Sequence, residues 1–461
     1  MNSTIRELTL VIVESPVLAD RLMRSSPPHI TVFATGGFLW SPQFDEQTQR
    51  LKRKALPGKL EERNELRRLM RQMVRIVVAT DPDPAGDFIA WTIAREFSLT
   101  RVERGMITSV GVGAIQTLLD TTWPQSADQL FSGLQNRYTI QSAWNRAMPN
   151  LTMKEAGLAA LFGSTAETNT FTTPDGKELF SNNSVSIPLN KKASVTPSNT
   201  SFWHQHQPIS TFDAVSAIVK KIQINSYQDA QERLRSLFET VHSETDAGLI
   251  SYPRSSERAY YQSTWNNLQG QWIAERSLNE FMPVALRSQT AAKTAHEAVH
   301  ALQLGVTPSW VKRHLPTAIA DVYELLYAAT VSSITMPSQI PALYSSEEFE
   351  VHFGSSVQTG HPHTHLTPVL PAADLGFQLC RLGVLRPSGF GAFLDGAIHR
   401  KKISINSSGH VRPGPLLEPY LHQAENLRNL LETLRDLADE PGVTAETLEP
   451  VFTSFTSRKP N

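Results

Sequence analysis

The chain has 461 residues, of which 40% are hydrophobic, and its 43 Lys and Arg nearly balance its 44 Asp and Glu. This length permits roughly two to four domains, and the composition is typical of a globular protein. The near-zero net charge neither favours nor excludes a nucleic-acid partner. A single cysteine, Cys380, excludes an intramolecular disulfide and a Cys-rich zinc ribbon. The sequence shows no secretory signal and no apolar run of membrane length, which predicts a cytoplasmic protein without a membrane partner.

The first 125 residues alternate apolar strand-like runs with stretches of helical periodicity. The predicted order is strand 8–13, helix 19–23, strand 31–35, helix 60–73, strand 76–79 and helix 87–97. Strands that alternate with helices in this way predict a parallel α/β sheet.

Carboxylates follow two of these predicted strands. Glu14 comes directly after strand 8–13, and Asp81 and Asp83 come after strand 76–79. Because the carboxyl ends of buried parallel strands meet at one sheet edge, we expect these side chains to lie close together. Carboxylate oxygens are the ligands that Mg²⁺ prefers. The sequence therefore predicts a magnesium site at this edge.

A second motif centres on Tyr252, which Pro253 and Arg254 follow. Pro253 disfavours the helical conformation for the tyrosine, so the phenol is expected at a strand end or in a turn. A free phenol has a pKa of about 10 and is a weak nucleophile at neutral pH. A neighbouring guanidinium favours the phenolate and can bind a phosphate with two hydrogen bonds. The pair suits attack on a phosphodiester, although a buried strand tyrosine beside a surface arginine would give the same short motif.

Residues 50–75 are strongly basic, with ten Lys and Arg against three Glu. A solvated helix face is the simpler interpretation of such a stretch. Beside a site that handles phosphates, the same charge also favours attraction of nucleic acid.

These segments together resemble the type IA DNA topoisomerases. The acidic strand ends resemble the TOPRIM fold, Tyr252 resembles the family's nucleophile, and the resemblance follows the family's order along most of the chain. It implies a multidomain α/β, α and β fold, with a parallel α/β TOPRIM domain and a toroidal core in a minimal form without zinc ribbons. The implied parts are TOPRIM at 1–125, helical DNA-binding domain at 126–165 and 370–438, β-rich arch at 166–222 and 339–369, helical domain with the tyrosine at 223–338, and a tail at 439–461. The last twenty residues look loosely ordered.

The resemblance also implies further site residues. Asp87 stands where the family has a second glutamate after its Asp-x-Asp, and it joins Glu14, Asp81 and Asp83 as an implied metal ligand. Residues 295–300 match the family's Ala-His-Glu-Ala-Ile-Arg except at the last position, which makes His296 a candidate partner of the scissile phosphate.

Three implied DNA-binding residues lie in other family-like segments. Arg146 belongs to a segment, 141–148, that resembles the family's arginine-containing helix after TOPRIM. Arg386 and Ser388 belong to a segment that resembles the family's Gly-Ile-Gly-Arg-Pro-Ser-Thr turn, where such groups can meet DNA phosphates.

The implied enzyme is an ATP-independent DNA topoisomerase that relaxes negative supercoils. Tyr252 would attack single-stranded DNA and form a 5′-phosphotyrosine, with Arg254 stabilising the phosphate charge and Glu14 among the catalytic groups. Mg²⁺ is the implied cofactor. The implied partner is a single-stranded segment of negatively supercoiled DNA, bound by a monomer in the nucleoid.

Three positions depart from the family's pattern. Leu18 stands in place of a lysine, Ala85 in place of a third acidic residue, and Phe38 in place of a histidine. Fewer carboxylates weaken a divalent-cation site, and a lost lysine removes a donor to phosphate.

Two alternatives from other functional classes follow from the same residues. A non-catalytic protein that binds single-stranded DNA would keep the scaffold while its acidic site decays, and Leu18 and Ala85 favour it. A zinc metallopeptidase would use His296, Glu297 and His300, because His-Glu-x-x-His on a helix places both imidazoles on one face.

Overall fold

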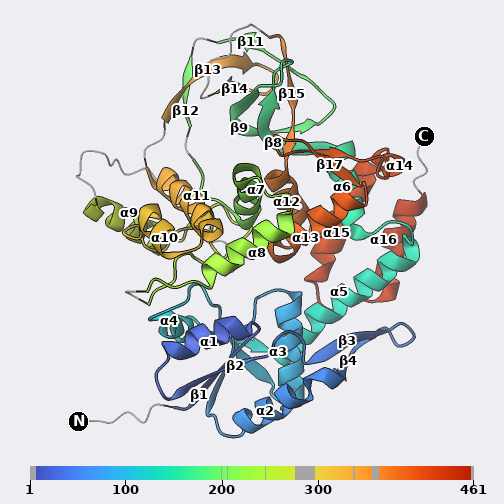
Figure 1. Cartoon of the computed structure of the whole chain (residues 1–461). Helices are drawn as coiled ribbons and strands as arrows, with labels where there is room; N and C mark the ends of the chain where they lie inside the picture. Colours follow the sequence, from blue (N-terminus) through green and yellow to red (C-terminus); the bar gives the residue numbers. More distant parts are fainter. Residues whose placement is uncertain are drawn as a thin grey trace. The chain divides into compact units, whose positions relative to one another are not determined.

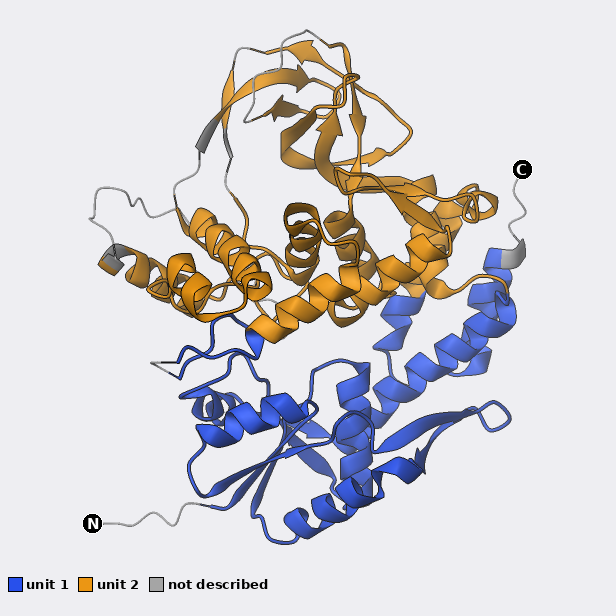
Figure 2. Cartoon of the chain, viewed as in Figure 1, with its two compact units in different colours: residues 1–149, 238–252, 434–457 blue, residues 150–237, 253–433, 458–461 orange. Residues whose placement is uncertain are grey.

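The computed structural model describes residues 7–198, 200–204, 206–243, 246–275, 296–335, 338–355 and 363–457. The chain divides into two compact units, each assembled from separate segments (Figure 2). Unit 1 contains residues 1–149, 238–252 and 434–457, and unit 2 contains residues 150–237, 253–433 and 458–461. None of the described helices has the length and apolar character that crossing a membrane requires.

A five-stranded sheet forms the centre of unit 1, in the order β2-β1-β5-β6-β7. The strands are β1 (Thr9–Val13), β2 (Ile30–Ala34), β5 (Arg75–Val78), β6 (Arg101–Arg104) and β7 (Trp123–Ser126). The first four pair in parallel, and β7 is antiparallel to β6. All of β1 is buried, as expected for a strand covered on both faces. The predicted parallel α/β sheet is confirmed.

Six α-helices surround or extend this sheet in unit 1 (Figure 1). They are α1 (Pro16–Arg24), α2 (Leu60–Met70), α3 (Pro84–Glu96), α4 (Ala114–Asp120), α5 (Ala127–Ala147) and α16 (Ala445–Ser457), with a short 3-10 turn at Pro57–Lys59. The middle of helix α3 is buried, since residues 88–94 all lie in the interior. Its apolar residues join β1 and the start of α5 in one core, which fixes the turn that precedes α3.

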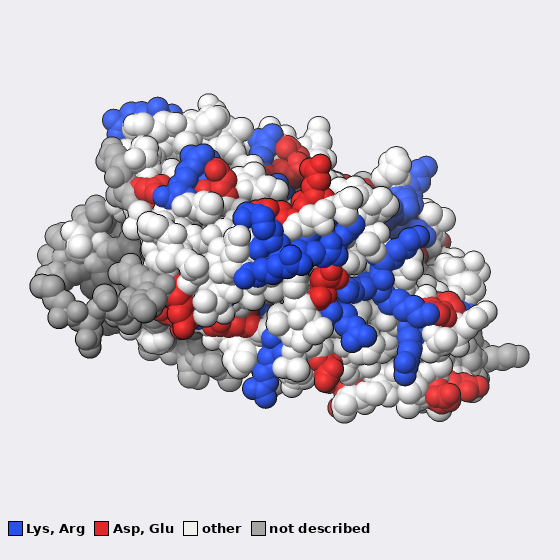
Figure 3. Space-filling view, turned by 90° about the horizontal axis from the view of Figure 1, so that it is seen from below, with Lys and Arg blue, Asp and Glu red and all other residues white. Residues whose placement is uncertain are grey.

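A β-hairpin that the sequence analysis did not predict carries much of the basic stretch. It consists of β3 (Trp40–Asp45) and β4 (Arg50–Ala55), paired over six residues each. Leu51 points into the core, while Arg53 lies over the Trp40 ring at 4.8 Å. Seen from below the view of Figure 1, Lys and Arg form a broad band on the surface (Figure 3).

The predicted loose tail at 439–461 is wrong for most of its length. Residues 445–457 form α16, which packs on α5 within unit 1. Leu448 is fully buried, and Phe452 meets Trp144 of α5 edge to face at 6.1 Å. This helix was not predicted from the sequence, because Pro450 lies inside it and polar residues separate its apolar ones.

Unit 2 contains an eight-stranded sheet in the order β10-β15-β8-β9-β14-β13-β11, with β12 also paired to β13. Its longer strands are β8 (Thr165–Thr172), β9 (Glu178–Pro188) and β13 (Ser338–Ser346), and its shorter ones are β10 (Ala193–Ser194), β11 (Thr196–Pro197), β12 (Ser201–His204), β14 (Val351–Gly354) and β15 (His365–Pro368). Two segments far apart in sequence therefore share one sheet, as the arch prediction requires. The strands of the predicted 166–222 segment end at His204, however, and helix α7 (Thr211–Ile222) occupies its last part.

Helices make up most of the remainder of unit 2. They are α6 (Met153–Gly163), α7 (Thr211–Ile222), α8 (Tyr227–Phe238), α9 (Gln262–Glu275), α10 (Pro308–His314), α11 (Thr317–Ile334), α12 (Ala372–Arg381), α13 (Phe390–His399), α14 (Glu418–Leu421) and α15 (Ala424–Ala438). A three-stranded sheet joins β16 (Leu370–Pro371), β17 (Ile403–Ile405) and β18 (His410–Pro413). Two of the boundaries between the units fall at the end of α8 and within α15, and the others follow residues 149, 252 and 457.

We predict that Leu448→Ala lowers the free energy of unfolding of unit 1 by about 3 kcal/mol, because it leaves a cavity between α16 and α5. Denaturant unfolding followed by circular dichroism measures the change. Glu449→Ala, at an exposed neighbouring position, is the control and should change little. Equal stability of the two variants would mean that the C-terminal segment does not pack as described.

Candidate active site at the acidic turn and Tyr252

Tyr252 is held in unit 1 by backbone hydrogen bonds to the segment that follows β6. The Tyr252 amide donates to the Thr108 carbonyl at 3.0 Å, and the Gly248 amide donates to the Val110 carbonyl at 2.8 Å. Gly111 closes this pairing with a φ of 95°, and a Cβ there would lie 2.1 Å from the Asp246 carbonyl. Only glycine fits this approach, so the segment before Tyr252 is fixed against residues 108–112, which follow β6, by backbone geometry.

The phenol of Tyr252 donates a hydrogen bond to Oδ1 of Asp81. Its ring packs edge to face on Phe238, with centroids 5.1 Å apart. Tyr252 and Asp81 line one small pocket with six others: Leu18, Ala79, Thr80, Pro82, Met106 and Ile107. The two motifs that the sequence suggested for phosphate chemistry are therefore in direct contact.

The acidic turn between β5 and α3 is tightly constrained. Asp83 caps α3, since its Oδ1 accepts a hydrogen bond from the Gly86 amide at 2.9 Å. The Thr80 hydroxyl donates to the Gly86 carbonyl at 2.9 Å. A Cβ on Gly86 would lie 1.9 Å from the Asp81 carbonyl oxygen. These contacts leave Asp81 little backbone freedom.

Arg104, the last residue of β6, lies beneath this turn and is fully buried. Its Nη1 donates to Oδ1 of Asp87 at 3.0 Å, and its Nη2 donates to the carbonyl oxygens of Thr80 at 3.2 Å and Asp81 at 3.1 Å. Burial raises the pKa of the Asp87 carboxyl, and the guanidinium opposes that shift. The sequence analysis missed Arg104, although the alternation along β6 places it on the same face as buried Val102.

The predicted metal ligands occupy one end of the sheet but are not arranged as a metal cage. Among the residues that the structure describes, no three Asp, Glu, His or Cys side chains form a group that could hold an ion. Asp87 is engaged by Arg104, Asp83 caps α3, and Asp81 accepts from Tyr252. Glu14 is half-buried at the end of β1. The arrangement thus does not fit a magnesium site made of these four carboxylates. Asp87 is the least suitable ligand, because its carboxylate is paired with Arg104.

The three residues that depart from the family pattern all lie at least partly buried in unit 1. Leu18 is buried in α1 and lines the pocket with Asp81 and Tyr252. Ala85 is partly buried in the first turn of α3. Phe38 packs edge to face on Phe88 at 5.2 Å, so it extends the core. Leu18 and Phe38 therefore make apolar contacts at positions where the sequence resemblance implied polar residues.

Arg254 and His296 belong to unit 2, where their backbone neighbours are fixed. The Ser255 amide donates to the Thr211 hydroxyl at 2.8 Å, and the Ser255 hydroxyl donates to the His296 carbonyl at 3.1 Å. The structure thus brings the segment after Tyr252 together with the His296 segment. The roles of the Arg254 and His296 side chains stay predictions.

The zinc peptidase interpretation of residues 296–300 is wrong. The segment is extended, with Val299 bridged to Ile209, whereas the zinc motif requires a helix. Glu297 accepts hydrogen bonds from the Tyr261 amide and the Thr264 hydroxyl, both at 2.8 Å. His300 is buried, its Nδ1 lies 2.9 Å from the Ala298 carbonyl oxygen, and burial lowers its pKa.

The predicted DNA-binding residues all lie on the surface of their units. Arg146 is exposed in unit 1 and pairs with Glu46 at 3.1 Å. Arg386 and Ser388 are exposed at the 3-10 turn before α13 in unit 2, where Gln231 donates to the Ser388 carbonyl at 2.7 Å. Exposure permits contact with a phosphate backbone, and DNA binding by these three residues stays a prediction.

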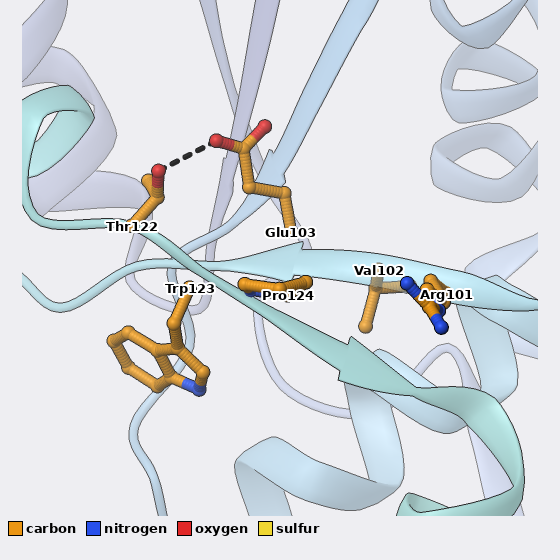
Figure 4. Close-up of a pocket in the computed structure, with 6 residues that line it drawn as sticks. All are labelled: Arg101, Val102, Glu103, Thr122, Trp123 and Pro124. Carbon is orange, nitrogen blue, oxygen red and sulfur yellow. Dashed lines mark hydrogen bonds between the residues drawn. The ribbon is translucent and has the colours of Figure 1, made fainter.

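A larger pocket of about 300 Å³ lies between β6 and β7 (Figure 4). Glu103 accepts a hydrogen bond from the Thr122 hydroxyl at 2.5 Å and also pairs with Arg75, while the Trp123 ring points away from that pair. The pocket contains none of the predicted site residues. Its carboxylate is already neutralised, so size alone does not make it the candidate site.

Comparison with known proteins supports the predicted resemblance. Residues 9–110 match the profile of the family described as Toprim domain. The chain is similar in structure to full-length topoisomerase I from Thermotoga maritima, with a TM-score of 0.64 and 15% identity, over 97% of this chain and 90% of that one. No curated protein sequence matches the chain. The type IA topoisomerase resemblance is therefore confirmed at the level of fold.

We predict that Gly86→Ala disrupts the acidic turn, because its Cβ would overlap the Asp81 carbonyl oxygen. The variant should lose more than about 2 kcal/mol of stability in denaturant unfolding. Gly58→Ala is the matched control, since a Cβ at Gly58 meets no atom within 4 Å. A Gly86→Ala protein as stable as the Gly58→Ala control would refute the described turn.

Proposed function

We propose that this chain, with its Toprim domain and topoisomerase I fold, cleaves and religates single-stranded DNA through Tyr252. The proposed outcome is ATP-independent relaxation of negative supercoils by a monomer of type IA character. The observation that carries the proposal is the hydrogen bond from the Tyr252 phenol to Asp81, which joins residues 171 positions apart in the chain. A phenol bound to a carboxylate at a Toprim strand end is suited to attack a phosphodiester.

Tyr252 would act as nucleophile and Asp81 as the acceptor of its proton. The phenolic oxygen forms a bond to phosphorus, and the bond from phosphorus to the 3′ oxygen of the preceding nucleotide breaks. Asp81 receives the phenolic proton and then releases it to solvent, while water supplies a proton to the departing 3′ oxygen, so that the step consumes and releases one proton overall. The product is a 5′-phosphotyrosine and a 3′ hydroxyl end. Because the new ester retains the energy of the old one, religation needs no ATP.

Positive groups would stabilise the charge that develops on the phosphate. Arg254, two residues after the nucleophile, is the proposed side-chain donor for this role, and His296 is a proposed further partner. Arg104 already engages Asp87, which leaves Glu14, Asp81 and Asp83 as the proposed ligands of Mg²⁺. Mg²⁺, the proposed cofactor, would supply further positive charge there. Arg146, Arg386 and Ser388 are the proposed contacts to the DNA backbone. Association with the nucleoid follows from the proposed DNA partner and stays a prediction.

A second candidate function is binding of single-stranded DNA without catalysis. Two observations at the acidic turn favour it. Arg104 is hydrogen-bonded to Asp87, and no lysine or arginine is found among the described residues that line the Tyr252 pocket. Relaxation of negatively supercoiled plasmid with Mg²⁺ and without ATP separates the two candidates. Relaxed topoisomers support the topoisomerase, and unchanged plasmid with retained single-strand binding supports the binding protein.

We predict that Tyr252→Phe abolishes covalent capture of single-stranded DNA, because only the attacking oxygen is removed. Single-strand affinity should stay within about twofold, which a gel-shift titration measures. Tyr138→Phe, elsewhere in unit 1, is the control and should still form the adduct. A denaturant-resistant adduct with Tyr252→Phe would show that another residue is the nucleophile.

We predict that Asp81→Asn slows adduct formation by about 10²-fold or more, because the amide cannot accept the phenolic proton. Single-turnover cleavage of an end-labelled oligonucleotide measures the rate. Asp120→Asn, at an exposed position on α4, provides the control for carboxylate loss. If Asp81→Asn and Asp120→Asn cleave equally fast, Asp81 does not receive the proton.

A further inference from the structure

Arg104 is an unusual residue for the interior of unit 1. Its side chain has no solvent exposure, and its Nε is buried without a hydrogen-bond partner among the described residues. Taking a guanidinium out of water costs several kcal/mol unless opposite charge and hydrogen bonds offset the loss. Packing alone therefore does not explain an arginine here, because an apolar side chain would avoid this cost.

The groups that offset this cost are oxygens of the acidic turn and of Asp87, in the first turn of α3. The two Nη atoms contact one carboxylate oxygen, from Asp87, and two carbonyl oxygens, from Thr80 and Asp81. Asp83 and Asp81 add further negative charge that acts on the same guanidinium. Carboxylate and carbonyl oxygens are also the ligands that a hard divalent cation takes. Arg104 thus occupies an oxygen environment of the kind that suits a metal ion.

Arg104 also fixes the geometry on which the proposed chemistry depends. Its hydrogen bonds to the carbonyls of Thr80 and Asp81 hold the backbone that carries the acceptor of the Tyr252 proton. Asp87, in the first turn of α3, is tied to β6 by the same side chain. A divalent ion bound within the turn would add positive charge beside a fixed guanidinium and meet its repulsion.

We propose that Arg104 is a built-in cation of the acidic turn, which organises the turn without a divalent ion and weakens its affinity for one. This proposal deepens the proposed function, and it rests on that function for the role of Asp81 as the acceptor of the Tyr252 proton. It assigns Arg104 as a positioning residue that acts through Asp81. Its test uses no DNA, so that its failure and the failure of DNA cleavage can be told apart.

The experiment is a titration of the protein with Mn²⁺, in which the electron paramagnetic resonance signal of free Mn²⁺ measures binding. The wild type should bind weakly, and Arg104→Gln should bind one Mn²⁺ on the order of tenfold more tightly, or better, because a fixed positive charge is removed. Asp83→Asn in the Arg104→Gln background should abolish the gain. Arg75→Gln removes another carboxylate-paired arginine of the same sheet and should bind like the wild type.

Thermal melting of the same proteins provides the second measurement. Mg²⁺ should hardly change the melting temperature of the wild type, whereas Arg104→Gln should melt lower without Mg²⁺ and regain stability with it. An Arg104→Gln protein that folds only with the ion would support the proposal, because the ion then replaces the guanidinium.

Three results would overturn the proposal. They are tight binding of one Mn²⁺ by the wild type that Asp83→Asn removes, no gain of affinity in folded Arg104→Gln, and an Arg104→Gln protein that stays unfolded with the ion present. In the last case Arg104 would have a structural role that a cation cannot take over.

Discussion

The hydrogen bond from Tyr252 to Asp81 depends on two backbone constraints in unit 1. The segment 246–252 pairs with residues 108–112, and that pairing needs the left-handed conformation of Gly111. The acidic turn in turn needs Gly86, where any side chain would meet the Asp81 carbonyl. Displacement of either partner by about 1 Å would be enough to separate a nucleophile from its proton acceptor. The candidate chemistry thus rests on the backbone more than on the side chains around it.

The charge balance of the turn explains how three acids and a buried arginine can be stable together. Arg104 is fully buried and Asp87 is partly buried, and their ion pair offsets part of the cost of burying the guanidinium. The same pairing removes Asp87 from the set of available metal ligands. Together with Leu18 and Ala85, it distinguishes this acidic site from the pattern that the sequence resemblance implied. The fold of a topoisomerase I is therefore combined with an altered arrangement of charge.

Much of the fold could be predicted because its signals are local. The buried strand β1 and the alternation of strands with helices predicted the parallel sheet, and the family resemblance located Tyr252. The β3–β4 hairpin was missed, because its basic strand β4 buries only Leu51 and lacks an apolar pattern. Helix α16 was missed because its apolar residues pack on Trp144, some 300 positions earlier, and the local sequence does not reveal that contact. Arg104 was missed because its partners lie on the turn after β5, and no local pattern links them.

The central claim is that Tyr252 is the residue that joins DNA. The most direct measurement is mass spectrometry of the covalent complex formed with a single-stranded oligonucleotide, after proteolysis and nuclease digestion. The account predicts a nucleotide attached through its 5′ phosphate to the peptide that contains Tyr252. A nucleotide on any other residue, or plasmid relaxation with no modified Tyr252 peptide, would contradict it.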